Sequence, residues 1–428
     1  MAQRVEFLLL TLHLDIASGD NNSWIDSRTA PVGKMTSPKS ALYLIALCGF
    51  TSSIANRSMD PLVSSIAGDF GVSLATAALV ITVFALPYSV SQPVLGPLGD
   101  HYGTSRLLKI CLWVQTLSLV FVVWSPTFEV LLVARFIGGI ASGGLMPIAL
   151  ATISNLFPPA ERQQAIARNV AALQSGFIIA ASLSGLLAVM FNWRGIFVIA
   201  AIMSLAAALL ITRFIPNTPA ASGHIRISGV LAGYRSIFEN PRSWICFAAV
   251  FLEGMALNGC LPFIAPILSE RGAGGPKEAG FIITGLALGA LLFTFAVKRL
   301  LGVATRYRLM AFGGLLAFMA PLVLAFPLPW QIQAAFFTVA GFGYMMVHNS
   351  IHAEVSELTS TARASAFAMH SCALFVGQAI GPIYFIGLSD LIGTADVLYV
   401  SALVMFLIGP TIAYLLPRTA VRTQAAGT

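Results

Sequence analysis

Apolar stretches of about 18 residues or more recur along this chain, and they limit its fold more than any other feature. Each could cross a hydrocarbon layer about 30 Å thick as an α-helix. Hydrophobic residues make up 57% of the 428 positions and charged residues only 10%, a balance that soluble globular proteins do not carry. We therefore expect an all-α integral membrane protein. Twelve transmembrane helices are predicted, at residues 42–66, 76–99, 106–124, 128–156, 164–190, 194–213, 243–269, 277–298, 306–325, 329–356, 362–390 and 395–416.

Lysine and arginine are unequally divided between the two sides of this topology. With an even number of spans both termini share a side, and that side receives most of the loop cations. The opposite side receives only Arg194, Arg271 and Lys277. Because cation-rich loops face the cytoplasm, we expect a multi-pass membrane protein with both termini cytoplasmic. The net charge of +7 then reflects topology, and no nucleic-acid partner is expected.

The first 40 residues differ from the rest of the chain. Their apolar run from Phe7 to Leu14 is too short to span a bilayer. Residues 1–40 are therefore predicted to form a tail, with Met35 as an alternative start of translation. The five cysteines lie in predicted spans without metal-ligand spacing, so they indicate neither a disulfide nor a metal site.

A constant offset of 201 residues relates two halves of the sequence. It aligns Pro61 with Pro262, Asp69 with Glu270, Arg162 with Arg363, and Gly176 with Gly377. This repeat predicts six-helix bundles at residues 41–213 and 243–416, a linker at 214–242 and a tail at 417–428, with the substrate site between the halves. Apolar residues at helical spacing in the linker predict an amphipathic helix on the inner leaflet.

The loop between the second and third predicted spans reads GPLGDHYGTSR, from Gly96 to Arg106. Its glycines let backbones approach closely, while Asp100 and Arg106 can be paired or released. The loop resembles the signature loop of the major facilitator superfamily of secondary transporters.

Further motifs are similar to members of that family. ARFIGGIASGGLMP in the fourth span resembles the Arg-x-x-x-Gly motif of proton-coupled members, with Arg135 as its cation. GYMMVHNSIHAEVSEL and GQAIGP in the tenth and eleventh spans look like bacterial arabinose-efflux permeases and twelve-span drug:proton antiporters. The resemblance implies two pseudo-symmetric six-helix bundles, a small-molecule substrate, protons as the driving force in place of a cofactor, no enzymatic activity, and a monomer in the lipid bilayer.

Two departures from the family pattern fall in the predicted gate loop, which comprises Gly96, Asp100, His101, Gly103, Arg106 and the facing Asn155. His101 and Thr104 stand where the family usually has cations, and Asn155 stands where it has an acidic partner. A neutral hydrogen bond, worth about 0.5–1.5 kcal/mol, is then the most that replaces the usual ion pair. We expect a looser cytoplasmic gate.

A third departure concerns the antiporter motif of the fifth span. Ala180 and Ala181 stand where the family has Gly-Pro, although the equivalent Gly381 and Pro382 of the eleventh span are intact. This departure weakens the prediction of antiport and does not affect the prediction of transport.

Four charged residues lie well inside predicted spans, and a charge at the centre of a helix costs about 2.5–3.5 kcal/mol. Arg57 and Asp60 are three residues apart, so they share a helix face. They form either a structural ion pair or a site at which Asp60 takes up a proton or a substrate cation and frees Arg57. Glu253 is either a proton carrier or a permanently hydrogen-bonded acid. Arg135 either disfavours protonation of a nearby carboxylate or extends to the outer interface.

A wider set of aromatic, sulfur-containing and polar residues falls on the spans expected to line a cavity. Most of the aromatic residues pack, and a minority would form an adaptable apolar pocket. The substrate-cavity candidates are Phe84, Tyr88, Met146, Phe177, Asn258, Tyr344, His348, Asn349, His370 and Gln378.

These features predict a secondary active transporter that moves a small organic solute by alternating access, as proton-coupled efflux. One alternative is a proton symporter or facilitator that imports a nutrient, distinguished by the direction of proton flux. Another is a transport-inactive relative that serves in assembly or sensing. Asp60, Arg135 and Glu253 argue against the latter, because a scaffold has no use for their insertion cost.

Overall fold

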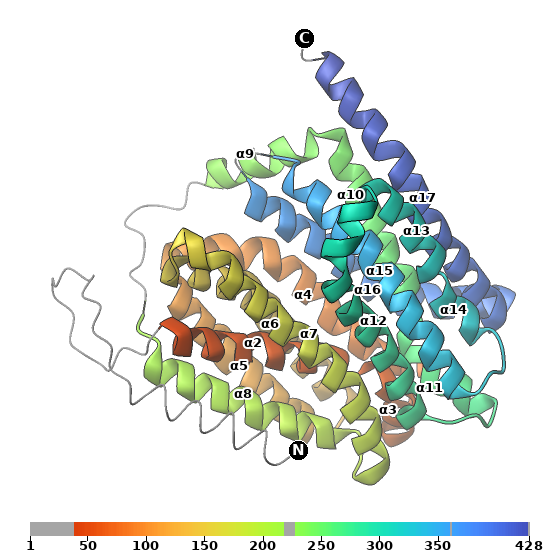
Figure 1. Ribbon diagram of the computed structural model, residues 1–428. Coiled ribbons are helices and arrows are strands. Elements are labelled where there is room, and N and C mark those ends of the chain that lie inside the picture. The colour runs from red at the N-terminus through yellow and green to blue at the C-terminus, as the bar shows by residue number, and fades with distance from the viewer. Residues whose placement is uncertain (1–37, 218–226, 360–361, 427–428) are drawn as a thin grey trace. The chain divides into compact units, whose positions relative to one another are not determined.

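The computed structural model describes residues 38–217, 227–359 and 362–426, apart from some side chains within them. The predicted N-terminal tail and Met35 lie outside these ranges. The described chain is helical throughout. Its first half contains α2 (Pro38–Arg57), α3 (Val63–Phe70), α4 (Leu74–Tyr102), α5 (Thr104–Trp124), α6 (Phe128–Leu156), α7 (Pro159–Met190) and α8 (Arg194–Phe214). Its second half contains α10 (Pro241–Glu253), α11 (Ile264–Glu270), α12 (Pro276–Val303), α13 (Arg306–Ala317), α14 (Met319–Leu324), α15 (Trp330–Ser356), α16 (Arg363–Ile392) and α17 (Thr394–Ala426) (Figure 1).

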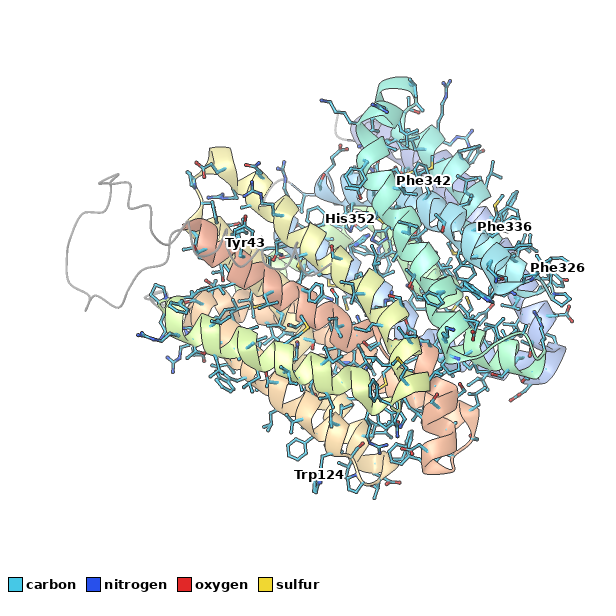
Figure 2. The ribbon with its side chains drawn as sticks, turned by 60° about the horizontal axis from the view of Figure 1, so that its bottom comes forward. Tyr43, Trp124, Phe326, Phe336, Phe342 and His352 are labelled. Atoms are coloured by element: carbon cyan, nitrogen blue, oxygen red, sulfur yellow. The ribbon has the colours of Figure 1, made fainter. Side chains whose placement is uncertain are left out.

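Helices cover all of the predicted spans, and within the described residues nine are long and apolar enough to cross a membrane. Large apolar side chains point outward from the bundle, as a lipid-facing surface requires. Trp124, for example, is 68% exposed and projects from the end of α5 (Figure 2).

Three predicted spans are broken where continuous helices were expected. The first is interrupted after Arg57 by a 3-10 turn, η1 (Asp60–Leu62), that contains Pro61. The seventh passes through a π-helical turn, η2 (Gly254–Asn258), and a 3-10 turn, η3 (Leu261–Phe263), that contains Pro262. The ninth divides between α13 and α14, close to Pro321. Each proline lacks the N–H that would continue the helical ladder.

The offset of 201 residues reappears in the packing of the two halves. A Cβ added to Gly176 would lie 2.8 Å from the carbonyl oxygen of Phe50, and one added to Gly377 would lie 2.1 Å from that of Phe251. Both members of the second pair are 201 residues after those of the first. Close approach of α2 to α7 is therefore repeated by α10 and α16, which is what a tandem repeat of one bundle requires.

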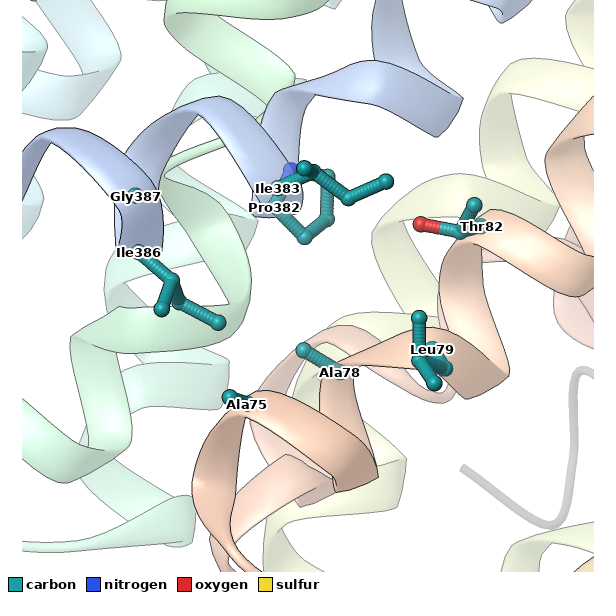
Figure 3. A pocket seen from close by; sticks show the side chains of 8 residues that line it. All are labelled: Ala75, Ala78, Leu79, Thr82, Pro382, Ile383, Ile386 and Gly387. Carbon is teal, nitrogen blue, oxygen red and sulfur yellow. The ribbon is translucent and has the colours of Figure 1, made fainter.

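The halves meet along two pairs of helices. α4 packs against α16, where the Thr82 hydroxyl donates to the carbonyl of Ala379 at 2.7 Å. Beside this contact, residues 75–82 and 382–387 line a small apolar groove (Figure 3). α7 packs against α12 so closely that a Cβ on Gly185 would lie 2.3 Å from the Pro276 carbonyl.

The linker contains the predicted helix, α9 (Ile227–Phe238). Ile237 is buried against the core, whereas Leu231 is 60% exposed. The Tyr234 hydroxyl donates to the Pro93 carbonyl on α4 at 3.0 Å. The Tyr234 side chain therefore joins α9 to the first half by a hydrogen bond. The position of α9 on the inner leaflet stays a prediction.

Candidate functional site

Arg57 links the broken first and seventh spans. Its guanidinium donates to Oδ2 of Asp60 at 3.3 Å and to Oδ1 of Asn258 at 2.9 Å. The Asp60 side chain is 1% exposed, and η1 touches η3 of the other half. The predicted ion pair is therefore present, and the predicted cavity residue Asn258 joins it. The Phe177 ring lies 5.6 Å from the Arg57 guanidinium.

Arg135 is buried at 2% exposure, so the alternative that it extends to the membrane interface is wrong. Its Nη1 donates to the carbonyl of Ala55 at 2.7 Å and its Nε to that of Val80 at 3.2 Å. The guanidinium also lies 3.9 Å from the centre of the Phe84 ring. Ala55 is in the last turn of α2, whose final carbonyls have no helical donor because the helix stops. Arg135 therefore caps the break in the first span.

Glu253 lies at the last residue of α10, where the π-helical turn begins, and its side chain is fully buried. Its Oε2 lies 2.8 Å from Nδ1 of His348 on α15, at hydrogen-bonding distance. Oε1 has no hydrogen-bond partner among the described residues. The sequence has no lysine or arginine within a turn of Glu253, and the structure supplies its partner from another helix.

Two further histidines, His352 and His370, lie beside His348. The ring of His348 lies 4.7 Å from that of His352 and 5.0 Å from that of His370, and the last two rings are 4.3 Å apart. Tyr344 stacks on His348 at 5.2 Å. His352 was not among the predicted site residues, although its position four residues after His348 places both on one helix face. The contribution of His370 depends on how α15 and α16 pack.

The remaining cavity candidates divide into those that cross between the halves and those that do not. Tyr88 packs on Phe375 with ring centres 4.3 Å apart, and Gln378 Nε2 donates to Asn56 Oδ1 at 3.3 Å. Met146 instead accepts from Asn169 at 3.5 Å within the first half, and Asn349 is half-buried on α15.

The predicted gate loop is largely helical. α4 continues through Gly96 and His101 to Tyr102, and only Gly103, with φ of 93°, separates it from α5. His101 is half-buried, while Arg106 and Asn155 are exposed. The side chain of Asp100 lies outside the described part of the structure.

An ion cluster at the C-terminal end of α15, just beyond His352, was not predicted. The buried carboxylate of Glu354 pairs with Arg242 and, at 2.8 Å, with Arg306. Arg306 also holds Glu357 through two hydrogen bonds of 2.7 and 3.1 Å. These hydrogen bonds lower the pKa of the Glu357 carboxyl below its usual value. Glu354 and Glu357 join α15 to the starts of α10 and α13.

Several known proteins are similar to this chain in sequence or in fold. Multidrug resistance protein 1 of Bacillus subtilis (strain 168) is 23% identical over 331 residues, which cover 76% of this chain and 83% of that protein. The putative transporter AraJ of Escherichia coli (strain K12) is 20% identical, over 67% of this chain and 72% of its own length. A bacterial homologue of the human lysosomal transporter Spinster superposes with a TM-score of 0.72 at 18% identity, covering 90% of this chain and 98% of that one.

The family model described as Major Facilitator Superfamily matches residues 45–360, which is most of the chain. Together with the broken, repeated helices and the buried charges between them, this match shows that the chain is a multi-pass membrane transporter that belongs to the major facilitator superfamily.

Proposed function

We propose that this protein exports a small organic solute across the bacterial inner membrane in exchange for protons, by alternating access of its two halves. Several relatives support export, since their names describe multidrug resistance or, for NepI of Shigella sonnei, purine ribonucleoside efflux. The excess of cations on the side of the linker supports cytoplasmic termini.

The bridge from Arg57 to Asp60 and Asn258 carries this proposal. It holds a buried carboxylate at the point where the broken spans of the two halves touch. Arg135 donates to the Ala55 carbonyl in the same broken span as Asp60. Protonation of Asp60 would remove the negative charge that Arg57 faces and free the guanidinium for substrate or for Asn258 alone. A proton would then change a contact between the halves, which is what coupling to alternating access requires.

Glu253 is the second carboxyl that can carry the proton. It belongs to the seventh span, which the repeat relates to the span of Asp60, and it too lies beside a helix break. A buried acid must gain and lose a proton without leaving a charge in hydrocarbon, and its pairing with His348 offers a polar partner in both states.

Flux measurements on the purified protein in vesicles test the proposal. A thermal-shift screen first identifies a solute, since a ligand at about 100 times its dissociation constant stabilises by about 2.7 kcal/mol. An outward-directed solute flux driven by a pH gradient is then expected. Asp60→Asn or Glu253→Gln should abolish the driven flux while gradient-independent solute exchange persists. Glu239→Gln is the matched control, because its carboxylate is 61% exposed on the surface.

Two outcomes oppose the proposal. If protons and solute move in the same direction, the protein is an importer that works as a symporter. If both carboxyl variants keep a pH-driven flux near that of wild type, proton coupling through these groups is wrong.

A further inference from the structure

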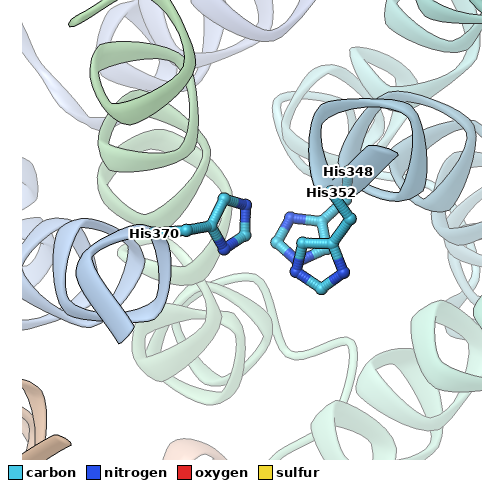
Figure 4. Close-up of side chains that lie close together, drawn as sticks. All are labelled: His348, His352 and His370. Atoms are coloured by element: carbon cyan, nitrogen blue, oxygen red, sulfur yellow. The ribbon is translucent and has the colours of Figure 1, made fainter. Parts of the chain in front are cut away.

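His348, His352 and His370 converge inside the second half from two helices. His348 and His352 are one turn apart on α15, and His370 on α16 faces both of them (Figure 4). One ring nitrogen from each histidine can be chosen so that all three atoms lie within 4.8 Å of one another. No other set of three such ligand residues meets this spacing among the described residues.

Hydrogen bonds within the protein do not account for this cluster. His370 is 1% exposed, yet neither of its ring nitrogens has a partner among the described residues. Buried imidazole nitrogens are costly when they are left unpaired. Three rings with nitrogens within 4.8 Å of one another, one ring having both nitrogens unpaired among the described residues, therefore favour a shared ligand that accepts lone pairs.

Glu253 prepares His348 for such a ligand. Oε2 of Glu253 lies 2.8 Å from Nδ1 of His348. As a carboxylate oxygen, it accepts the Nδ1–H of the neutral His348 imidazole. That tautomer leaves the lone pair on Nε2 facing away from Glu253. Metal-ligating histidines almost always have a carboxylate or carbonyl in this position, which fixes both the ring and the tautomer.

We propose that His348, His352 and His370 bind one divalent first-row transition metal ion, such as Zn²⁺ or Co²⁺, with Glu253 as the positioning residue for His348. Imidazole nitrogens suit these ions and not Mg²⁺ or Ca²⁺, which prefer oxygen. Zn–N bonds of about 2.0–2.1 Å place tetrahedral ligand atoms about 3.4 Å apart, so the rings close by roughly an ångström around the ion. Three protein ligands leave a fourth position open, and the ion would tie α15 to α16.

Metal binding is measured on the full chain in detergent, with no polyhistidine tag. Titration with Co²⁺ is expected to give visible absorption bands that saturate at one equivalent, and Zn²⁺ should displace them. His352→Ala and His370→Ala should each weaken Co²⁺ binding at least 100-fold. Glu253→Gln should weaken it about 10- to 100-fold, as loss of a positioning carboxylate does elsewhere. His101→Ala, in a half-buried histidine outside the cluster, should bind Co²⁺ as wild type does.

The proposal is overturned if wild type binds no Co²⁺, if Mg²⁺ competes as well as Zn²⁺ does, or if both histidine variants bind with wild-type affinity. Gel filtration and circular dichroism identify folded variants. If His352→Ala does not fold, His352→Gln replaces it. Because no transport is measured, failure here leaves the proposed proton-coupled export standing. Conversely, if the wild-type protein shows no pH-driven flux, Co²⁺ binding by the wild-type protein still supports the metal site.

Discussion

Arg57 and Asn258 occupy equivalent positions in the two halves, 201 residues apart, and the guanidinium of the first donates to the amide oxygen of the second at 2.9 Å. Equivalent residues touch only where a pseudo-two-fold axis passes between them. The axis that relates the two bundles therefore runs beside this hydrogen bond and beside Asp60. A charge at this point therefore acts on both halves.

Replacing Asn258 with alanine should weaken the contact between the halves that this bond provides. A hydrogen bond to a charged group contributes about 1.5–3 kcal/mol, so the conformer described here should lose population by roughly ten-fold or more. Distances between spin labels placed on α4 and α16 would report the shift.

Gln333→Ala is the control for that experiment. Its amide is also buried, but it donates to the Leu328 carbonyl within the second half. If the two variants give the same distance distribution, the Arg57–Asn258 bond does not bias the arrangement of the halves.

Gly377→Ala should destabilise the second half. The added Cβ would lie 2.1 Å from the Phe251 carbonyl and 3.0 Å from the Met255 amide, both of which are backbone atoms that cannot turn aside. Such overpacking costs about 1–3 kcal/mol. Gly387→Ala on the same helix is the matched control, because its Cβ would meet no described atom within 4 Å. A lower midpoint of thermal unfolding is expected for the first variant alone, and equal midpoints would contradict the packing argument.

The positions of the helices could be predicted from sequence, because hydrophobic length and turn residues set them locally. The predicted span at 128–156 coincides with α6, and that at 106–124 differs from α5 by two residues. The breaks within the first, seventh and ninth spans were harder to predict from the sequence. At the break in the first span, the donor to the Ala55 carbonyl is Arg135, which lies 80 residues later and on another helix.

The candidate site shows the same division. The ion pair of Arg57 with Asp60 follows from their spacing of three residues, although α2 ends at Arg57 and Asp60 begins η1. The partner of Glu253 and the position of His370 depend on how α10, α15 and α16 pack against one another, and hydropathy carries no information about that packing.

Stability at low pH should depend on Glu357. Hydrogen bonds from Arg306 lower its pKa in the folded protein, so its contribution is present above the unfolded pKa and is lost as pH falls through the folded value. Its side chain is 49% exposed and screened by solvent, so the pair contributes no more than about 1 kcal/mol. Glu357→Gln should therefore lower the unfolding midpoint slightly at pH 7, and the difference from wild type should disappear below about pH 4. A difference that persists at pH 3 would mean that the ion pair is not its source.

Arg135→Lys separates the charge of Arg135 from its shape. The guanidinium reaches Ala55 on α2 and Val80 on α4 with two different nitrogens while it lies on the Phe84 ring. An ammonium keeps the charge but cannot reproduce that planar fork. If the role of Arg135 is to cap the broken span, the Arg135→Lys variant should be less stable by about 1–3 kcal/mol, as expected when a buried carbonyl loses its donor. Its pH-driven flux should fall as well. Arg308→Lys, at an exposed position of α13, should change neither quantity. If charge is what matters, Arg135→Lys should match wild type in both measurements and only a neutral variant such as Arg135→Met should fail.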